Sequence, residues 1–133
     1  MITGVAHLCF VVGDLEASID FYCGKLGMKP AFDFLNDAGK RFGLYVHAGG
    51  RSFLELFQGR LADRAADQTY QHLCLEVDDI QATAKAIRAA GVEVTEVKLG
   101  GDRSWQAWLT DPDGNRIELH QYTPQSKQTP HLA

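Results

Sequence analysis

The chain alternates between short apolar runs and turn residues, and the same order of runs occurs twice. The phrases HLCFVV from His7 and HLCLEV from His72 look like strands, and a stretch with helical periodicity follows each of them. Three further strand-like runs follow in each half, at 28–35, 40–47 and 52–58 and then at 92–98, 104–110 and 115–122. The turns between them are rich in Gly, Asp and Asn, as tight hairpins require. The pattern predicts two βαβββ modules and therefore an α+β fold.

Both expected helices have recognisable ends. The first, LEASIDFYCGKLG, begins after Asp14 and stops at Gly27. The second, IQATAKAIRAAG, begins after Asp79 and stops at Gly91. Aspartate is a good N-cap because its carboxylate accepts a hydrogen bond from a free backbone N–H, and glycine is the usual residue after a helix. We therefore expect the two helices at equivalent places in the two modules.

The same pattern divides the chain into four parts. Residues 1–58 form the first module and 71–122 the second. Residues 59–70 are polar and alanine-rich, which is typical of a linker. Residues 123–133 show no periodicity, so we expect a loose tail.

Composition narrows the classes of function. The chain has 133 residues, 45% of them hydrophobic, and a formal net charge of -4. This mild acidity argues against nucleic acid and against an anionic membrane surface, and no apolar run approaches the roughly 20 residues of a membrane-spanning helix. We expect no signal peptide in MITGVAHLCF. The odd number of cysteines, three, favours free thiols in the reducing cytoplasm.

Candidate chemistry comes from polar residues that match between the halves. His7 and His72 open the two modules, while Glu55 and Glu118 stand inside the apolar frames FLELF and RIELH of the two last strands. A lone carboxylate in such a frame is costly to bury, and a cation removes that cost. Two imidazole nitrogens and two carboxylate oxygens suit a divalent transition metal.

Each of these residues also has an ordinary explanation. A single strand histidine is more often a packed or surface residue than a ligand, and Glu55 alone would suit the solvated face of an edge strand. The metal interpretation rests on the conjunction of two histidines and two glutamates, one pair in each module.

These motifs give the chain a family resemblance. HLCFVVGDLEASIDFYCGKLGMKP resembles the opening of bacterial glyoxalase I, and DPDGNRIELHQ resembles the closing motif of the vicinal oxygen chelate superfamily. That superfamily holds glyoxalases, bleomycin-resistance proteins and dioxygenases, and the resemblance extends from about His7 to Tyr122. It implies two βαβββ modules that form a cupped, partly open mixed β-barrel around a metal site.

The resemblance also implies a function. By motif position the metal ligands would be His7, Glu55, His72 and Glu118, with Glu118 as the catalytic base and Glu55 assisting. One divalent ion would be held per site, with nickel or cobalt favoured and zinc or manganese also suitable. The expected reaction is that of a lactoylglutathione lyase: a small thiol conjugate, a hemithioacetal, is isomerised through an enediolate. Such enzymes usually form homodimers.

The sequence departs from the glyoxalase pattern at the positions that grip glutathione. The family's arginine is replaced by Val11 and its asparagine by Gly59. Arg41, Arg51 or Arg103 would have to supply a substitute, although a place in or beside a turn explains each of them.

A few neighbours of the candidate ligands have open roles. Cys9 and Cys74 share a strand face with the histidines, and small apolar packing explains them better than chemistry. His120 shares the face of Glu118 and is a candidate for touching substrate, whereas Glu76 fits the mouth of a pocket and a solvated position equally well. Four aromatic residues are candidates for an apolar substrate wall, although core packing explains them better: Trp105, Trp108, Phe53 and Phe57.

Other functions on the same scaffold stay open. One group is an epimerase, a dioxygenase or a thiol transferase for antibiotic resistance. Epimerases that resemble this fold often carry glutamine in place of Glu55, and the transferases and dioxygenases use three protein ligands. The other alternative is a metal-free protein that binds a drug or metabolite, which would not require the four ligands.

Overall fold

The computed structural model describes residues 1–65 and 68–132. The chain divides into two units, Met1–Ala66 and Asp67–Ala133, and each unit contains its own four-stranded sheet. The predicted linker 59–70 includes positions 66 and 67, which lie outside the described residues. Where that linker begins and ends stays a prediction.

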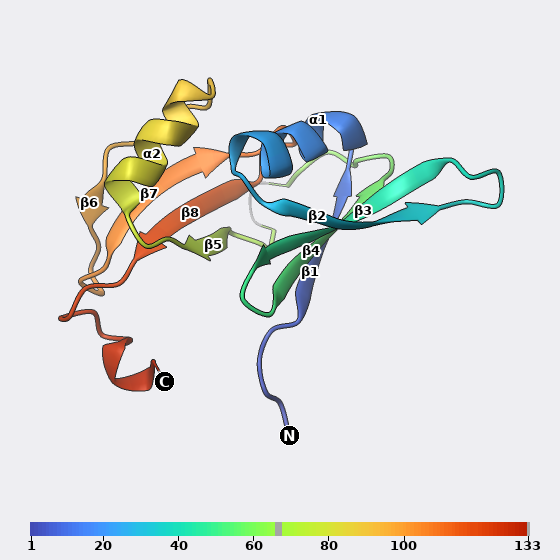
Figure 1. Ribbon diagram of the computed structural model, residues 1–133. Helices are drawn as coiled ribbons and strands as arrows, with labels where there is room; N and C mark the ends of the chain where they lie inside the picture. The colour runs from blue at the N-terminus through green and yellow to red at the C-terminus, as the bar shows by residue number, and fades with distance from the viewer. Residues whose placement is uncertain (66–67, 133) are drawn as a thin grey trace. The chain divides into compact units, whose positions relative to one another are not determined.

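The first unit follows the predicted βαβββ order (Figure 1). Its elements are β1 (His7–Val12), α1 (Leu15–Ile19), η1 (Asp20–Lys25), β2 (Lys29–Leu35), β3 (Arg41–Gly49) and β4 (Ser52–Gln58). The strand order across the sheet is β1-β4-β3-β2, with β1 and β4 parallel and the other pairs antiparallel. The last strand of the module therefore lies beside the first.

The second unit repeats this arrangement. Its elements are β5 (Leu73–Glu76), α2 (Ile80–Ala89), β6 (Lys98–Leu99), β7 (Trp105–Thr110), β8 (Arg116–Gln121) and the short helix η2 (Thr129–His131). The strand order is β5-β8-β7-β6, with β5 and β8 parallel. Two mixed sheets with few helices confirm the α+β prediction.

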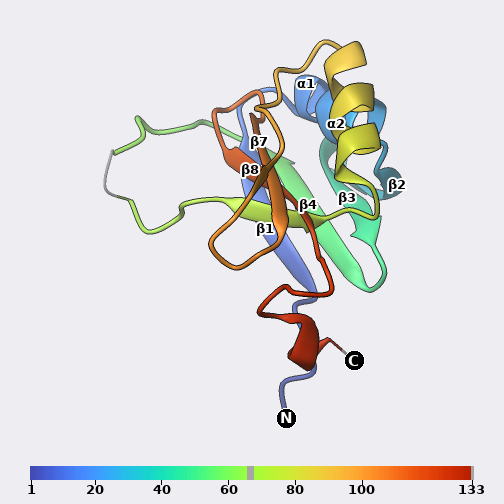
Figure 2. The same cartoon turned by 90° about the vertical axis from the view of Figure 1, so that its left-hand side faces the viewer.

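Alternation along the last strand of each unit separates the core from the candidate site. Leu54 and Leu56 of β4 are at most 2% exposed and face the side that α1 covers, as Ile117 and Leu119 of β8 do beneath α2 (Figures 1 and 2). Because successive strand side chains point to opposite faces, Glu55 lies on the face away from this core.

The predicted helix ends are confirmed. The Asp14 carboxylate accepts from the backbone N–H of Ala17 at 3.0 Å, and that of Asp79 accepts from Ala82 at 2.9 Å. Gly27 has a φ of 75°, and Gly91 has a φ of 86°. These are left-handed values that glycine adopts without strain.

A pair of glutamines, which the sequence pattern did not single out, ties each helix to its sheet. The side-chain oxygen of Gln58, at the end of β4, accepts from the backbone N–H of Leu15 at 2.8 Å. The side-chain oxygen of Gln121, at the end of β8, accepts from Ile80 at the same distance. We call these two contacts the glutamine latches.

The first helix differs from the prediction of one regular helix over 15–27. Only α1 is α-helical, and η1 continues as a π-helix whose wider turn is closed by the bond from Leu26 N–H to the carbonyl of Phe21. Phe21 is 3% exposed and the adjacent Tyr22 is fully buried. The wider turn thus accompanies the burial of two consecutive aromatic side chains, which a regular amphipathic stripe does not provide.

The strand predicted over 92–98 is also wrong over most of its length, since β6 contains only Lys98 and Leu99. The carbonyls of Val94 and Thr95 accept hydrogen bonds from the Arg88 guanidinium instead. The Thr95 hydroxyl accepts from the backbone N–H of Trp108. Side chains therefore replace the backbone ladder in this segment, although Thr95 N–H still donates to the carbonyl of Trp108.

The segment predicted to be a loose tail is held in place over its described part, 123–132. The side chain of Gln128 donates to Asp102 at 2.6 Å, and Ser126, which is 3% exposed, accepts from the hydroxyl of Ser104 at 2.8 Å. Both Figures 1 and 2 show the chain leaving β8 and ending in η2. Polar contacts of this kind have no periodicity and so left no signal in the sequence.

The lengths and hydropathy of the helices bear on one further point. Within 1–65 and 68–132, none of them has the length and apolar character needed to cross a bilayer.

Candidate metal centre

The first unit brings His7 and Glu55 together. Strands β1 and β4 pair in parallel, so the first residue of β1 and the middle residue of β4 project from neighbouring positions on one face. His7 Nε2 lies 3.3 Å from Glu55 Oε2, and the Tyr45 hydroxyl lies 3.2 Å from His7 Nδ1. Tyr45 thus orients the ring so that Nε2 points to the carboxylate.

The second unit builds the same pair from the equivalent positions. His72, just before β5, places Nε2 at 3.2 Å from Glu118 Oε2 on β8. The His72 ring stands edge-on to the Trp108 ring, with centroids 4.9 Å apart. The Glu118 side chain is 9% exposed, against 20% for Glu55, so the second carboxylate is the more buried one.

Glu118 has further polar partners that Glu55 does not match. His120 is buried, and its Nδ1–H donates to Glu118 Oε1 at 3.1 Å. On its other side, His120 Nε2 lies 3.7 Å from Asp102 Oδ2. Hydrogen bonds from the side chain of Gln128 and from Ser104 hold the pKa of Asp102 below its ordinary value. The buried side chains of Glu118 and His120 are therefore followed by the partly exposed carboxylate of Asp102.

The two cysteines beside the glutamates are protonated thiols at neutral pH. Partial desolvation, followed by the charge of Glu118, raises the pKa of Cys74 to about 12. The pKa of Cys9 is raised for the same reasons, with Glu55 as the neighbouring charge. Cys9, Cys23 and Cys74 are all free of disulfides, as expected.

The face of the first sheet that carries Glu55 also carries several aromatic rings. Phe32 stacks on Tyr45 with ring centroids 4.7 Å apart, and Tyr45 stacks on Phe53 at 5.1 Å. Phe57 packs against Phe34 at 4.8 Å. We call this set the aromatic surface; with Phe42 it comprises Phe32, Phe34, Phe42, Tyr45, Phe53 and Phe57.

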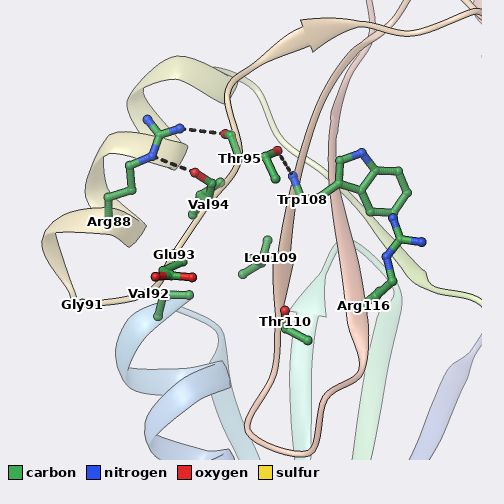
Figure 3. Close-up of a pocket in the computed structure, with 10 residues that line it drawn as sticks. All are labelled: Arg88, Gly91, Val92, Glu93, Val94, Thr95, Trp108, Leu109, Thr110 and Arg116. Atoms are coloured by element: carbon green, nitrogen blue, oxygen red, sulfur yellow. Dashed lines mark hydrogen bonds between the residues drawn. The ribbon is translucent and has the colours of Figure 1, made fainter.

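A pocket of about 880 Å³ opens in the second unit beside β7 (Figure 3). The Arg116 guanidinium lies 4.5 Å from the centroid of the Trp108 ring, which is the ring that borders His72. A cation above an aromatic face suits an anionic or planar part of a ligand. The lining residues are Arg88, Gly91, Val92, Glu93, Val94, Thr95, Trp108, Leu109, Thr110 and Arg116.

The two positions that depart from the glyoxalase pattern lie against each other. A Cβ built on Gly59 would come within 2.6 Å of Val11 Cγ1, so the valine occupies the space that a side chain at 59 would need. Arg41, one candidate substitute, is engaged by Glu16 at 2.6 Å and Asp33 at 3.2 Å. Its pKa is raised by those hydrogen bonds. This supports the ordinary explanation for Arg41.

The structure thus assembles the four predicted ligands as two His–Glu pairs, one in each unit. An imidazole Nε2 and a carboxylate oxygen about 3 Å apart are close to the spacing of neighbouring donors around a transition metal. The donor set therefore fits a divalent ion. Tyr45 and Asp102 were missed, although the expected hairpin register, which pairs Tyr45 with Glu55, would have pointed to the tyrosine.

Known proteins share both the sequence and the fold. Residues 4–119 match the family model of the glyoxalase/bleomycin resistance protein/dioxygenase superfamily. The chain is 35% identical over 123 residues to a probable lactoylglutathione lyase of Vibrio cholerae, covering 88% of this chain and 89% of the relative. It is 35% identical over 121 residues to the lactoylglutathione lyase of Haemophilus influenzae, covering 86% and 90%.

A solved structure adds a relative of another kind. TnmS3, an antibiotic binding protein from Streptomyces sp. CB03234, superposes with a TM-score of 0.72 at 29% identity, over 92% of this chain and 98% of its own. Sequence and fold agree, and the chain belongs to the glyoxalase/bleomycin resistance protein/dioxygenase superfamily.

Proposed function

We propose that this chain is a metal-dependent lyase/isomerase of glyoxalase type, acting on a small substrate that offers two adjacent oxygens. The observation that carries the proposal is the repeated pair: His and Glu approach to 3.3 Å in one unit and 3.2 Å in the other. Relatives that are named lactoylglutathione lyase at 35% identity support a glyoxalase-type function.

We infer that His7, Glu55, His72 and Glu118 are metal ligands and that each site holds one divalent ion. Nitrogen and carboxylate ligands suit nickel or cobalt, which we favour, and also zinc or manganese. When bound, such an ion supplies Lewis-acid stabilisation of charge on the substrate oxygens.

Glu118 is the residue that we assign to proton transfer. As general base it would take the proton from the carbon beside the carbonyl, which leaves an enediolate, and would return the proton to the neighbouring carbon. His120 holds one oxygen of Glu118 at 3.1 Å, so the carboxylate is fixed in orientation. In the described part of the first unit, no histidine two residues further along the strand donates a hydrogen bond to Glu55. The role of an assisting ligand suits this less constrained carboxylate.

The substrate is expected to be a small thiol conjugate whose thiol part differs from glutathione. The glutathione-gripping side chains are replaced by Val11 and Gly59, and the valine occupies the space that a side chain at 59 would need. Arg116 over the Trp108 ring is a cationic group that can receive an anionic part of the conjugate instead. We also expect a location in the cytoplasm, because free thiols suit a reducing compartment. The resemblance to glyoxalases leads us to expect a homodimer.

The test begins with metal content. The chain is stripped, reconstituted with nickel or cobalt and desalted, and we expect about one ion per chain, held less tightly in Glu55→Gln and in His7→Ala. Turnover is then measured with hemithioacetals of glutathione and bacillithiol and with acyl-CoA epimers. Glu118→Gln should lower kcat by about 10²–10⁴-fold, the usual contribution of a general base.

The control is Glu96→Gln, because this carboxylate is 87% exposed and pairs only loosely with Arg88 at 3.8 Å. It should retain the metal and the activity. Wild-type turnover in Glu118→Gln, or metal affinity that ignores His7→Ala, would contradict the proposal.

A second candidate is a metal-free protein that binds an antibiotic or another aromatic molecule. The aromatic surface favours it, since Phe32 is 52% exposed and Phe42 is 41% exposed, and TnmS3 is named as an antibiotic binding protein. A stripped chain that binds an aromatic drug and shows no metal-dependent turnover would make this the leading function. Phe32→Ala should then weaken drug binding.

A further inference from the structure

The second unit contains a sulfur, an oxygen and a nitrogen donor in one cluster. The donor atoms of Cys74, Glu118 and His120 all lie within 4.8 Å of one another, and among the described residues such a group occurs once. We propose that this cluster is a binding site for a thiophilic divalent cation, zinc or cadmium, complete within the second unit. It shares Glu118 with the proposed catalytic set but requires neither His7 nor Glu55.

The cluster is built on paired strands. In the parallel register of β5 and β8, Cys74 is the Cα partner of Glu118, and His120 follows Glu118 by two residues on the same face. Both strands carry a backbone ladder, so the spacing of the three Cα atoms is fixed. The backbone therefore holds the three residues close together before a cation binds.

The distances require only a small contraction. Around zinc, with bonds of roughly 2.0–2.3 Å, tetrahedral donors stand about 3.5 Å apart. His120 Nδ1 and Glu118 Oε1 are already 3.1 Å apart, and Cys74 is exposed, so a cation can reach its sulfur. A rotation of the thiol completes a three-ligand site that leaves a fourth position for water.

The surroundings of His120 provide an independent argument. A histidine that binds a metal through one ring nitrogen usually donates its other N–H to a carboxylate. His120 Nε2 is buried and has no hydrogen-bond partner among the described residues, yet it lies 3.7 Å from Asp102 Oδ2. A cation at Nδ1 would move the ring proton to Nε2. The Nε2–H could then donate a hydrogen bond to the Asp102 carboxylate, which Gln128 holds in place at 2.6 Å.

The first unit supplies a natural control. Cys9 is the Cα partner of Glu55 in the equivalent parallel register, so two of the three donors are repeated. The third position is Phe57, whose ring belongs to the aromatic surface. The first unit therefore has no nitrogen donor at the position equivalent to His120.

The test uses the full chain, stripped of metal and loaded with Co²⁺ as a spectroscopic substitute for zinc. The wild type should show a thiolate-to-cobalt charge-transfer band, and Cys74→Ser should lose it while Cys9→Ser keeps it. In a competition with a chromophoric chelator, Cys74→Ser and His120→Asn should each weaken zinc binding at least tenfold. Asp102→Asn should weaken it by about tenfold, as loss of a partner to a liganding histidine does.

His7→Ala separates this site from the proposed catalytic centre. It should leave the charge-transfer band and the zinc affinity unchanged, even where it removes nickel and turnover. A wild type without the band, a band that survives Cys74→Ser, or a band that His7→Ala removes would each overturn the site. None of these outcomes depends on whether a hemithioacetal is turned over, so the proposed function is judged separately.

Discussion

The two units bring a histidine and a glutamate together in the same way and then surround the glutamate differently. In the first unit, Phe57 occupies the position two residues after Glu55, and its ring lies over Gly43, its Cα partner in β3. In the second unit, the equivalent positions are His120 and Gln106. A glycine and a phenylalanine make an apolar floor, whereas a glutamine and a histidine make a polar one.

This difference teaches that repetition of a motif does not imply repetition of a role. Both pairs meet the distance required of metal ligands, but only Glu118 is gripped by a buried histidine, with Asp102 behind it. The roles that we propose follow this difference: Glu55 is assigned as an assisting ligand and Glu118, the more firmly held carboxylate, as the base. The variants below test that division of labour.

The largest effect is expected from exchanging the two glutamates for glutamine one at a time. Glu118→Gln removes a proton acceptor and should lower kcat by about 10²–10⁴-fold, while Glu55→Gln should act mainly through weaker metal binding. Steady-state assays at increasing metal concentration separate the two variants. Excess metal should restore the turnover of Glu55→Gln but not that of Glu118→Gln. If excess metal restored the turnover of both variants equally, the two glutamates would not have different roles.

Thiol reactivity gives the next effect. With its pKa raised to about 12, Cys74 in the metal-free folded chain has far less thiolate at pH 8 than an ordinary cysteine. Iodoacetamide should label it about 100-fold more slowly than in the unfolded chain, since only the thiolate attacks. Its rate should keep rising with pH up to about 12, whereas the unfolded chain levels off near its ordinary pKa.

Mass spectrometry of peptides after timed quenching measures both rates. Cys9 serves as the matched site, because its pKa is raised by the same kinds of neighbours. Cys74 that is labelled faster than Cys9 would show that the second site is the less shielded one.

The packing of Phe57 on Gly43 in the first unit is tested by Gly43→Ala. The new Cβ would come within 2.5 Å of the Phe57 ring and 2.9 Å of the carbonyl oxygen of Leu56, so the ring must move and the backbone must shift. Overpacking of this kind costs about 2 kcal/mol of unfolding free energy. Urea unfolding measures it, with Gly101→Ala, where nothing lies within 4 Å, as the control.

The smallest expected effect is the difference in unfolding free energy between variants of the two glutamine latches. Gln121→Ala removes one hydrogen bond to the N-terminus of α2 and should cost about 1 kcal/mol, as the loss of a helix cap does. Gln58→Ala should cost more, because Gln58 also donates to the carbonyl of Gly13. Differential scanning calorimetry of the two variants decides this, and a larger loss in Gln121→Ala would contradict it.

Much of this fold could be predicted from the sequence because its signals are local. The strand runs, the caps at Asp14 and Asp79 and the stop glycines each depend on a few neighbouring residues. The His–Glu pairs could be predicted because duplication displayed them twice. What escaped was decided by side-chain contacts that follow no helix or strand period: the Arg88 guanidinium donates to the carbonyls of Val94 and Thr95.

The surroundings of the candidate site escaped for the same reason. Asp102 lies in the turn LGGDR, where an aspartate is an ordinary turn residue and draws no attention. Gln128 lies in a segment with no periodicity. Only the folded second unit shows that the two side chains meet and that His120 faces them. A sequence can indicate that a residue shares a face with Glu118, but not what lies behind it.

The contact between Val11 and Gly59 has a consequence for how this chain can change. A Cβ added at 59 would meet Val11 Cγ1 at 2.6 Å, so the valine side chain has to shift before any side chain fits there. The two positions are therefore coupled: residues other than glycine should be tolerated better at 59 when a smaller or more flexible residue stands at 11. A library of variants that changes both positions at once should return folded pairs of residues at 11 and 59. Some of these pairs would be missed if position 59 were changed first and alone.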